Sequence, residues 1–283
     1  MTAVPASQPV TLPAVLPDLP DVADHRIAGK ATVPAVELLE LLARFAAGHM
    51  GWGDSLPLPL AMTDVVFPRF LLVQAVPRCT FAVRLASLET GLRASLTSTI
   101  GLPNRMKRLR EHAVATFAPP PSPPSASPAP DFDFEIEADR VYRELIPFGP
   151  RYRNLRGTIR LGRAGATGLV RSPEPPRRPP PLAGCPFLLD AAMHLACLWG
   201  QRYAGYIAYP TGFAARVLHR PVAAGERRCV VAPRFVSPRR VLCDLWLSDE
   251  AGVLCDAVTG LTMSPLVNGP APPSWIALAG AGV

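Results

Sequence analysis

Two short stretches, far apart in the chain, carry residues suited to acid and base chemistry. The first runs from His25 to Pro34 and reads H-x-x-x-G-x-x-x-x-P, with Gly29 at the glycine position. The second runs from Asp190 to His194 and reads D-x-x-x-H inside an apolar run. A histidine and a carboxylate are the side chains that remove and donate protons near neutral pH. Together the two stretches predict one acid–base active site.

Each stretch borders or lies on a predicted helix. Pro34 suits an early helix position, and apolar residues follow it at helical spacing: Leu38, Leu41, Leu42 and Phe45. In the second half, the apolar run from Leu189 toward Trp199 predicts a helix that carries both Asp190 and His194. Because they are four residues apart, these two side chains share one helix face. A carboxylate in such a run is costly to bury without a partner, which favours function over an exposed ion pair.

The two halves of the chain echo each other. Residues 80–87 and 92–99 predict two strands joined by a turn that contains Gly91. Residues 241–248 and 253–260 predict a second such pair. One helix and several antiparallel strands therefore occur twice, which is an internal repeat. The repeat is consistent with a long helix wrapped by a sheet in each half, but it does not name a fold.

The order and spacing of the two motifs resemble the dehydratase domains of polyketide synthases and related fatty-acid-type synthases. The resemblance covers roughly residues 21–266. It implies an α+β fold called a double hotdog. In that fold two antiparallel sheets, each wrapping one long helix, join into one continuous sheet, and a single active site lies between the halves.

Prolines divide the chain near its middle. The Pro-rich segment 118–130 favours an extended, polyproline-type path over helix or sheet. A second proline cluster, residues 172–181, predicts a surface loop ahead of the second helix. With the resemblance, these breaks give the expected organisation: a leader at 1–20, an N-terminal hotdog at 21–117, a Pro-rich linker at 118–130, a C-terminal hotdog at 131–267 and a flexible tail at 268–283.

The resemblance also implies a reaction and a role for each motif residue. His25 is the base that removes the α-proton of a β-hydroxyacyl thioester, and Gly29 offers a backbone N–H to the thioester carbonyl, where negative charge develops. Asp190 protonates the departing β-hydroxyl, and His194 orients Asp190. Water leaves and an α,β-enoyl product remains, so the implied activity is that of a carbon–oxygen lyase. His25 must be neutral to act, and we expect desolvation to raise the pKa of Asp190.

Further segments resemble parts of the family's substrate site. Phe148, Gly149 and Tyr152 lie in a stretch that resembles Y-G-P-x-F, with phenylalanine and tyrosine exchanged. A tyrosine at the first position can hydrogen-bond near the leaving hydroxyl, whereas Phe148 cannot. Pro210 lies in a looser match to L-P-x-x-I/F. The expected substrate-binding residues are Gly29, Pro34, Phe148, Gly149, Tyr152 and Pro210.

Several alternatives stay open. The same scaffold and acid–base pair serve double-bond isomerases and ring-forming cyclases, and the sequence does not separate these from dehydratases. A hotdog thioesterase is disfavoured because hydrolysis does not need this pairing. A non-catalytic docking or structural module is the alternative from another class, against which the intact His25, Asp190 and His194 argue. The sequence does not decide between a free-standing protein and a domain of a larger synthase.

Composition and charge bear on the partners. The chain has 283 residues, 49% of them apolar, which allows a sizeable core. Its formal net charge of +7 suits an acidic macromolecular partner, and the resemblance implies an acyl carrier protein whose phosphopantetheine arm holds the substrate. Family domains also pair as homodimers or with neighbouring synthase domains. The densest basic run, residues 105–110, is either a docking surface for the carrier protein or a solvated face. The sequence has no long basic tract interleaved with aromatic residues, which disfavours nucleic-acid binding.

The cysteines and the apolar segments indicate a compartment. The six cysteines form no C-x-x-C pair and no zinc spacing with histidine, which predicts buried thiols in a reducing environment. The resemblance requires no metal and no redox cofactor. The proline-broken N-terminal stretch does not resemble a secretory signal, and the most apolar stretch, residues 56–76, is too interrupted to span a bilayer. We therefore expect a cytoplasmic protein with no membrane or nucleic-acid partner.

Overall fold

One antiparallel sheet of twelve strands runs through the whole molecule. The computed structural model describes residues 8–16, 20–53, 56–101, 106–120, 131–174, 180–220, 224–266 and 269–278. The strand order is β1-β6-β7-β8-β4-β12-β15-β14-β13-β11-β10-β9. Strands β4 and β12 pair antiparallel at the centre, so the sheet of the first half continues into that of the second.

The strands of this sheet are β1 (Val10–Ala14), β4 (Leu60–Val66), β6 (Thr80–Leu88), β7 (Gly91–Gly101), β8 (Lys107–Ala118), β9 (Phe134–Glu137), β10 (Leu155–Gly162), β11 (Gly165–Arg171), β12 (Ala208–Leu218), β13 (Glu226–Ser237), β14 (Arg240–Ser248) and β15 (Leu254–Pro265). A separate small sheet has the order β2-β3-β5 and consists of β2 (Arg26–Ile27), β3 (Lys30–Val33) and β5 (Leu71–Leu72). The helices are α1 (Ala35–Met50), α2 (Ala138–Glu144), α3 (Pro186–Tyr203) and the short 3-10 segments η1 (Pro20–Asp24), η2 (Val73–Arg78) and η4 (Pro150–Tyr152).

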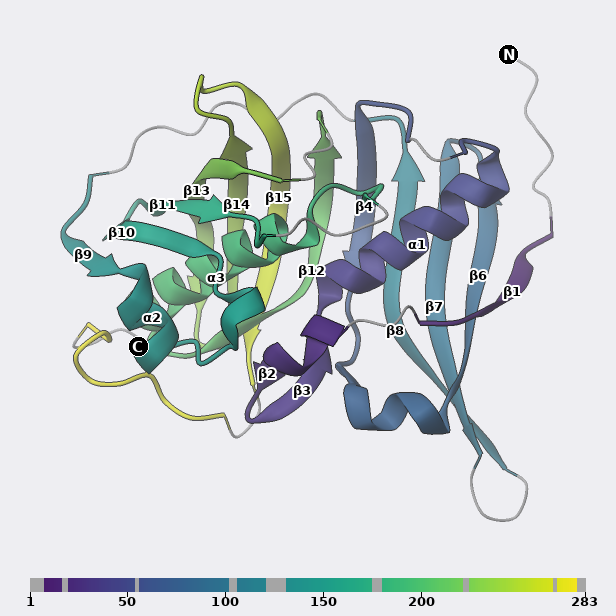
Figure 1. Cartoon of the computed structure of the whole chain (residues 1–283), viewed down its shortest axis with the longest axis horizontal. Coiled ribbons are helices and arrows are strands. Elements are labelled where there is room, and N and C mark those ends of the chain that lie inside the picture. The colour runs from purple at the N-terminus through teal and green to yellow at the C-terminus, as the bar shows by residue number, and fades with distance from the viewer. Residues whose placement is uncertain are drawn as a thin grey trace.

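Each half of the sheet holds one long helix against its face. Helix α1 crosses strands β6 to β8, and α3 crosses the strands of the second half (Figure 1). Helix α1 buries leucines on its sheet-facing side and ends at Gly51, whose left-handed φ of 68° suits a glycine C-cap. Helix α3 is buried around its whole circumference from Pro186 to Arg202, as expected of a helix without a polar face. The charged residues on α3 therefore lie inside the protein.

The structure confirms the predicted fold class. The predicted strands at 80–87 and 92–99 are β6 and β7, and those at 241–248 and 253–260 are β14 and β15. Both predicted helices are present as α1 and α3. The arrangement is two helix-wrapping antiparallel units joined into one sheet, because β4 and β12 share hydrogen bonds.

The ends of the predicted domains take part in packing. Val10–Ala14, assigned above to the leader, forms strand β1 and pairs with β6. In the segment assigned to the tail, Ile276 is fully buried and the backbone N–H of Leu278 donates to the carbonyl of Arg202. Most of the Pro-rich segment, residues 121–130, lies outside the described residues, as do 175–179 of the second proline cluster. The proposed domain limits therefore stay predictions.

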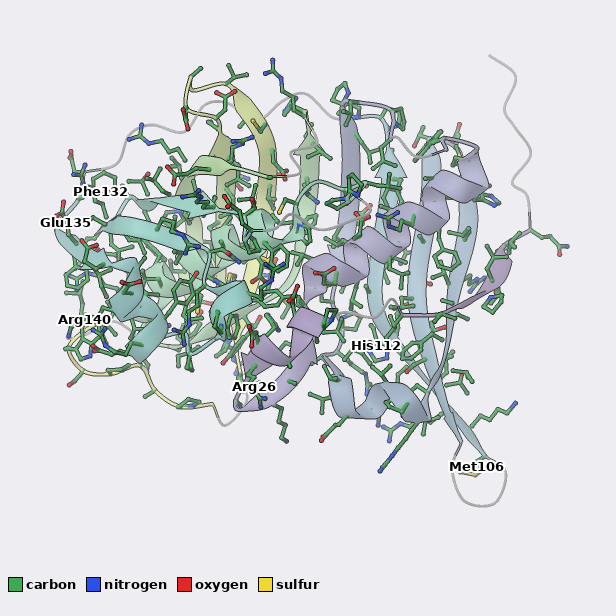
Figure 2. The ribbon with its side chains drawn as sticks, in the orientation of Figure 1. Arg26, Met106, His112, Phe132, Glu135 and Arg140 are labelled. Atoms are coloured by element: carbon green, nitrogen blue, oxygen red, sulfur yellow. The ribbon has the colours of Figure 1, made fainter. Side chains whose placement is uncertain are left out.

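The basic run extends one hairpin beyond the sheet. Strands β7 and β8 project as a long hairpin (Figure 1), and Met106 lies close to its tip (Figure 2). Lys107, Arg108 and Leu109 are exposed there, whereas Arg105 lies outside the described residues. Cations and apolar side chains therefore share this arm of the protein.

Within the described ranges, no helix combines the length and apolar character needed to cross a membrane. All six cysteines are free thiols, and five of them are buried, the exception being Cys79. The cytoplasmic location stays a prediction.

A buried carboxylate on α1 holds the loop that leads into α3. The two oxygens of Glu40 accept the backbone N–H groups of Leu182 and Ala183 at 2.9 and 2.8 Å. The carbonyl of Ala183 in turn accepts a hydrogen bond from Arg216 on β12 at 2.8 Å. Burial raises the pKa of Glu40, and the two N–H donors and Arg44 oppose that effect. The first half of the chain thus fixes where the second helix begins.

Replacing Glu40 by alanine should destabilise the protein. Glu40→Ala leaves two backbone N–H groups without acceptors near the α1–α3 junction, which costs about 2–4 kcal/mol in free energy of unfolding. The measurement is urea unfolding followed by circular dichroism. The matched control is Arg44→Ala, which removes the half-exposed ion-pair partner of Glu40 and should cost less than about 1 kcal/mol. Equal stability of Glu40→Ala and the wild type would show that the loop is held by other contacts.

Candidate active site

A tight hairpin places His25 at the edge of a pocket. His25 follows η1 and precedes β2, and the two-residue turn Ala28-Gly29 connects β2 to β3. Both turn residues have positive φ, 48° and 76°, as the favoured two-residue hairpin turns require. The turn brings Thr32 beside His25, where the Thr32 N–H donates to the His25 carbonyl at 2.9 Å. Gly29 thus has a conformational role, and the donation of its N–H to a thioester carbonyl stays a prediction.

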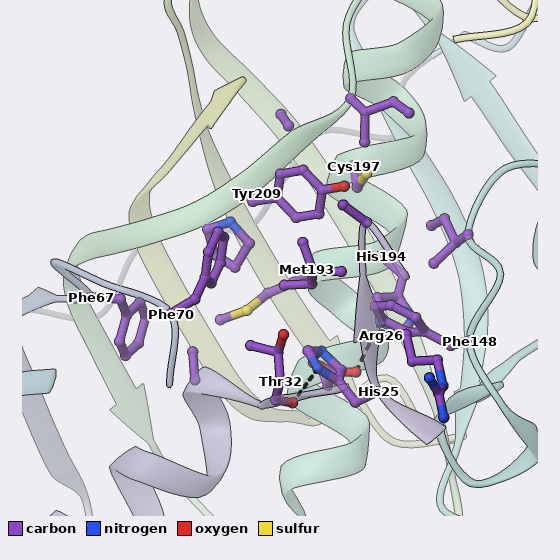
Figure 3. A pocket seen from close by; sticks show the side chains of 18 of the residues that line it. His25, Arg26, Thr32, Phe67, Phe70, Phe148, Met193, His194, Cys197 and Tyr209 are labelled. Carbon is purple, nitrogen blue, oxygen red and sulfur yellow. Dashed lines mark hydrogen bonds and ion pairs between the residues drawn. The ribbon is translucent and has the colours of Figure 1, made fainter. Parts of the chain in front are cut away.

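The hydrogen bond of the His25 ring decides which nitrogen is basic. Nδ1 of His25 lies 2.9 Å from the Thr32 carbonyl oxygen (Figure 3). A carbonyl oxygen can only accept, so Nδ1 carries the proton and Nε2 keeps its lone pair. Burial lowers the pKa of His25 below its ordinary 6.5, Asp190 opposes that shift and His194 adds to it. The ring is therefore suited to accept a proton at Nε2.

Asp190 is a carboxylate held between two histidines. It lies on the buried helix α3 and is 5% exposed. One oxygen, Oδ1, lies 3.8 Å from Nε2 of His25, and the other, Oδ2, lies 2.9 Å from Nε2 of His194. The second contact is short, although it is not aligned as an ideal hydrogen bond. The structure thus brings the three predicted catalytic residues together from opposite halves of the chain.

The pKa of Asp190 differs from the sequence-based expectation. Desolvation does raise it, as expected, but His194 and then His25 stabilise the carboxylate by more, so the pKa lies below the ordinary 3.8. The prediction of a raised pKa is therefore wrong for the protein without substrate. The prediction considered the apolar run around Asp190 and not the two imidazole rings that lie beside the carboxylate in space.

Phe148 packs between the two histidine rings. Its ring centroid lies 4.5 Å from that of His25 and 4.9 Å from that of His194 (Figure 3). Gly149 makes this position accessible, because a Cβ there would lie 2.2 Å from an oxygen of Asp24. The Gly149 N–H donates to the Asp24 carbonyl at 2.7 Å, directly before His25 in the chain. Phe148 thus covers one side of both histidines with an apolar ring.

The catalytic candidates open into a largely apolar pocket of about 380 Å³, within the usual size range for small-molecule sites. Phe70 and Tyr209 lie on its wall with their rings in contact (Figure 3). The residues of the predicted site that line it are His25, Gly29, Phe148, Asp190, His194 and Pro210. Arg26 and Arg69, both exposed, are the basic residues of the lining. The pocket therefore suits an apolar chain with an anionic or polar end outside.

Three residues of the predicted substrate site lie behind the pocket wall. Pro34 precedes the first turn of α1 with extended backbone, and Gly149 packs on Asp24. Tyr152 is fully buried, its ring lies edge-on to His25 at 5.1 Å, and its hydroxyl donates to Glu37 at 3.4 Å. The structure gives these residues supporting positions around the acid–base pair.

Sequence reasoning missed two residues of this region. Tyr142 on α2 reaches the Nδ1 atom of His194 with its hydroxyl at 3.2 Å. His112 on β8 lines the pocket, with its Nε2 atom 2.7 Å from the hydroxyl of Ser98. Neither belongs to a recognisable motif, and only the packing of α2 and β8 against the site brings them near it. Among the described residues, no group of three or more His, Cys, Asp or Glu side chains is arranged to hold a metal ion.

Comparisons with known proteins place the chain in a family. The family model described as polyketide synthase dehydratase N-terminal domain matches residues 119–273, more than half of the chain. The chain belongs to the polyketide synthase dehydratase family, as the resemblance predicted. No curated protein matches its sequence.

Solved dehydratase domains share the fold. The dehydratase domain from the CurJ module of curacin polyketide synthase superposes with a TM-score of 0.70 at 17% identity, covering 92% of this chain and 93% of that one. The dehydratase domain of RzxB from Pseudomonas fluorescens gives 0.69 at 18% identity, covering 91% and 94%. The dehydratase domain of a mycocerosic acid synthase-like polyketide synthase gives 0.67 at 16% identity, covering 90% of each chain. At these identities the likeness shows the double-hotdog fold.

The two neighbours of His25 should shift its pKa in opposite directions. Asp190→Asn removes the negative charge that raises the pKa of His25, so the pKa should fall further below 6.5. His194→Gln removes a neighbour that lowers it, so the pKa should rise relative to the wild type. The measurement is a ring-nitrogen NMR titration of the five histidines, with exposed His49 as the internal control. Shifts of the same sign in both variants would contradict this electrostatic account.

Proposed function

We propose that this protein removes water from a β-hydroxyacyl thioester carried on an acyl carrier protein and leaves an α,β-enoyl thioester. The observation that carries the proposal is the separation of 3.8 Å between Nε2 of His25 and Oδ1 of Asp190 at one apolar pocket. A basic nitrogen and a carboxyl group at that separation can act on adjacent carbons of one acyl chain, the base on one carbon and the acid on the hydroxyl of the next. Membership of the polyketide synthase dehydratase family supports the same reaction.

The proposed elimination moves one proton in each direction. Nε2 of His25 takes the α-proton, and the electrons of that C–H bond form the Cα=Cβ double bond. The Cβ–O bond breaks, and the hydroxyl leaves as water with the proton of Asp190. The lone pair on Nε2, left by the Nδ1–H bond to Thr32, suits His25 to this role.

The acid step needs a proton on a carboxyl group whose pKa is low. One proton suffices for the pair, because elimination transfers it in effect from Asp190 to His25, and its return over 3.8 Å resets the site. A bound acyl chain would displace water from the pocket and add to the desolvation of the carboxylate, which raises the pKa of Asp190 and favours the protonated form. The low pKa in the empty site is thus compatible with an acid role once substrate is bound.

Negative charge that develops on the thioester carbonyl needs a donor. Gly29 lines the pocket at the β2–β3 turn, close in the chain to His25, and its backbone N–H is our candidate. A fixed backbone dipole stabilises an enolate without reorganisation. His194 is the candidate for holding Asp190 in position, since it lies 2.9 Å from Oδ2.

The substrate and its carrier follow from the pocket and the charge. Apolar walls suit an acyl chain, and the exposed Arg26 and Arg69 at the lining suit the phosphate of a phosphopantetheine arm. The net charge of +7 suits an acidic carrier protein. The β7–β8 hairpin with Lys107 and Arg108 is the candidate docking arm, with a merely solvated arm as the alternative.

One observation favours a second candidate function. Phe148 stands where the family usually has a tyrosine, so no hydroxyl from this position reaches the leaving group. A double-bond isomerase or a cyclase uses the same base and acid without expelling water. These reactions are the alternatives that the assay must separate from dehydration.

The test is a mass-spectrometric assay on β-hydroxyacyl thioesters of carrier protein and of pantetheine. We expect the loss of one water with the wild type. His25→Ala and Asp190→Asn should slow the reaction by about 10²–10⁴-fold, because each removes one proton-transfer group. His49→Ala, which changes an exposed histidine at the end of α1, is the matched control and should keep wild-type rates.

The other outcomes identify the alternatives. An unchanged mass with a moved alkene or a closed ring would favour an isomerase or a cyclase. No reaction with any thioester, while circular dichroism shows a folded protein, would favour a non-catalytic module and contradict the proposal.

A further inference from the structure

Tyr142 is buried at the back of the acid–base pair and belongs to no recognised motif. It lies on α2 in the second half and is 3% exposed. Its hydroxyl oxygen accepts the backbone N–H of Asn154 at 2.9 Å and that of Leu155 at 2.8 Å. The same oxygen lies 3.2 Å from Nδ1 of His194. Three nitrogen atoms therefore surround one phenolic hydroxyl.

The hydrogen-bonding capacity of a hydroxyl decides the direction of the third contact. A phenolic O–H accepts with its lone pairs and donates with a single proton. The two backbone N–H groups can only donate, so they occupy the acceptor side of the oxygen. The proton of Tyr142 is left for His194, and Nδ1 of His194 must accept it with a lone pair. Burial raises the pKa of Tyr142, which keeps that proton on the hydroxyl.

We propose that Tyr142 is a positioning residue that fixes the tautomer of His194, with the ring proton on Nε2, the nitrogen nearer the carboxylate of Asp190. Nε2 of His194 lies 2.9 Å from Oδ2 of Asp190, so the carboxylate attracts a proton on that nitrogen even though the contact is not aligned as an ideal hydrogen bond. With the opposite tautomer, the Nε2 lone pair would face a carboxylate oxygen, and the two would repel each other. The effect of Tyr142 on the tautomer of His194 does not depend on which reaction the protein catalyses. The effect of Tyr142 on the rate of that reaction rests on the proposed function.

The orientation of His194 matters in this chain because, within the described ranges, few other side chains hold Asp190. Phe148 carries no hydroxyl, and its ring lies against both histidines. Among the described residues, the charged or polar side chains found against Asp190 are those of His25 and His194. The backbone N–H groups of residues 154 and 155 hold the Tyr142 hydroxyl, which holds His194, which in turn orients Asp190. All of these groups belong to the second half of the chain.

The direct test is the ring-nitrogen NMR spectrum of His194 in the intact protein. We expect a protonated Nε2 and an unprotonated Nδ1 in the wild type at neutral pH. Tyr142→Phe should give a mixture of tautomers or the Nδ1-protonated form, and Tyr203→Phe should leave the His194 spectrum unchanged. Tyr203 is the matched control because its hydroxyl donates to Asp133 and not to the site. A protonated Nδ1 in the wild type would overturn the proposal, even if Tyr142→Phe did not fold.

The kinetic test separates this role from simple support of the fold. Tyr142→Phe should lower kcat/KM for dehydration by about tenfold or more, as the loss of a buried hydrogen bond to a catalytic group does. In a His194→Gln background, Tyr142→Phe should lower kcat/KM little further, because glutamine has no ring tautomer for Tyr142 to fix. An equal loss in both backgrounds would mean that Tyr142 supports only the backbone at 154–155 and would overturn the proposal. A wild type that dehydrates nothing would instead overturn the proposed function, and the His194 spectrum would still decide the role of Tyr142.

Discussion

A carboxylate buried in an apolar helix is the constraint on which this structure depends. Asp190 lies on α3, which is buried from end to end, and a lone carboxylate there would carry a large desolvation penalty. Two histidines offset that penalty, His194 from the same helix and His25 from the other half of the chain. The arrangement of Asp190 between two histidines therefore requires both halves to be folded and in contact. A hotdog unit with only one of the two motifs would hold either His25 alone or Asp190 with His194.

The contacts that join the halves are the ones that place these groups. Glu40 of α1 holds the loop ahead of α3, and Gly149 of the second half packs on Asp24 beside His25. Strands β4 and β12 close the sheet between them. Each is a tight polar or backbone contact, which tolerates little displacement. The distance between Nε2 of His25 and Oδ1 of Asp190 is thus a property of the interface between the halves.

What could be predicted from the sequence was what local patterns encode. The spacing of Leu38, Leu41 and Leu42 gave α1, and the turn at Gly91 gave the β6–β7 hairpin, because period and turn chemistry are local. The two motifs gave His25, Asp190 and His194 because the resemblance supplied their pairing. The direction in which the pKa of Asp190 shifts could not be predicted in this way, since it depends on how closely the rings of His25 and His194 lie to the carboxylate in the folded protein.

The same limit explains the residues that were misplaced or missed. A motif shows that Tyr152 belongs near the site, but only packing shows that it stands behind His25 and outside the pocket. Tyr142 has no motif at all, and its role follows from counting the donors around one oxygen. Residues that act through another residue leave little trace in a single sequence. They become visible when each buried polar atom is assigned a partner.

The proposed reaction requires one acyl chain to lie across His25 and Asp190, with its α-carbon at the first and its β-hydroxyl at the second. The most direct measurement is a crystal structure of the protein with a β-hydroxyacyl pantetheine amide, in which the thioester sulfur is replaced by nitrogen. We predict the α-carbon within about 3–3.5 Å of Nε2 of His25 and the β-hydroxyl within hydrogen-bonding distance of Asp190. A ligand that occupies the pocket with its α-carbon and hydroxyl turned away from both side chains would contradict the account.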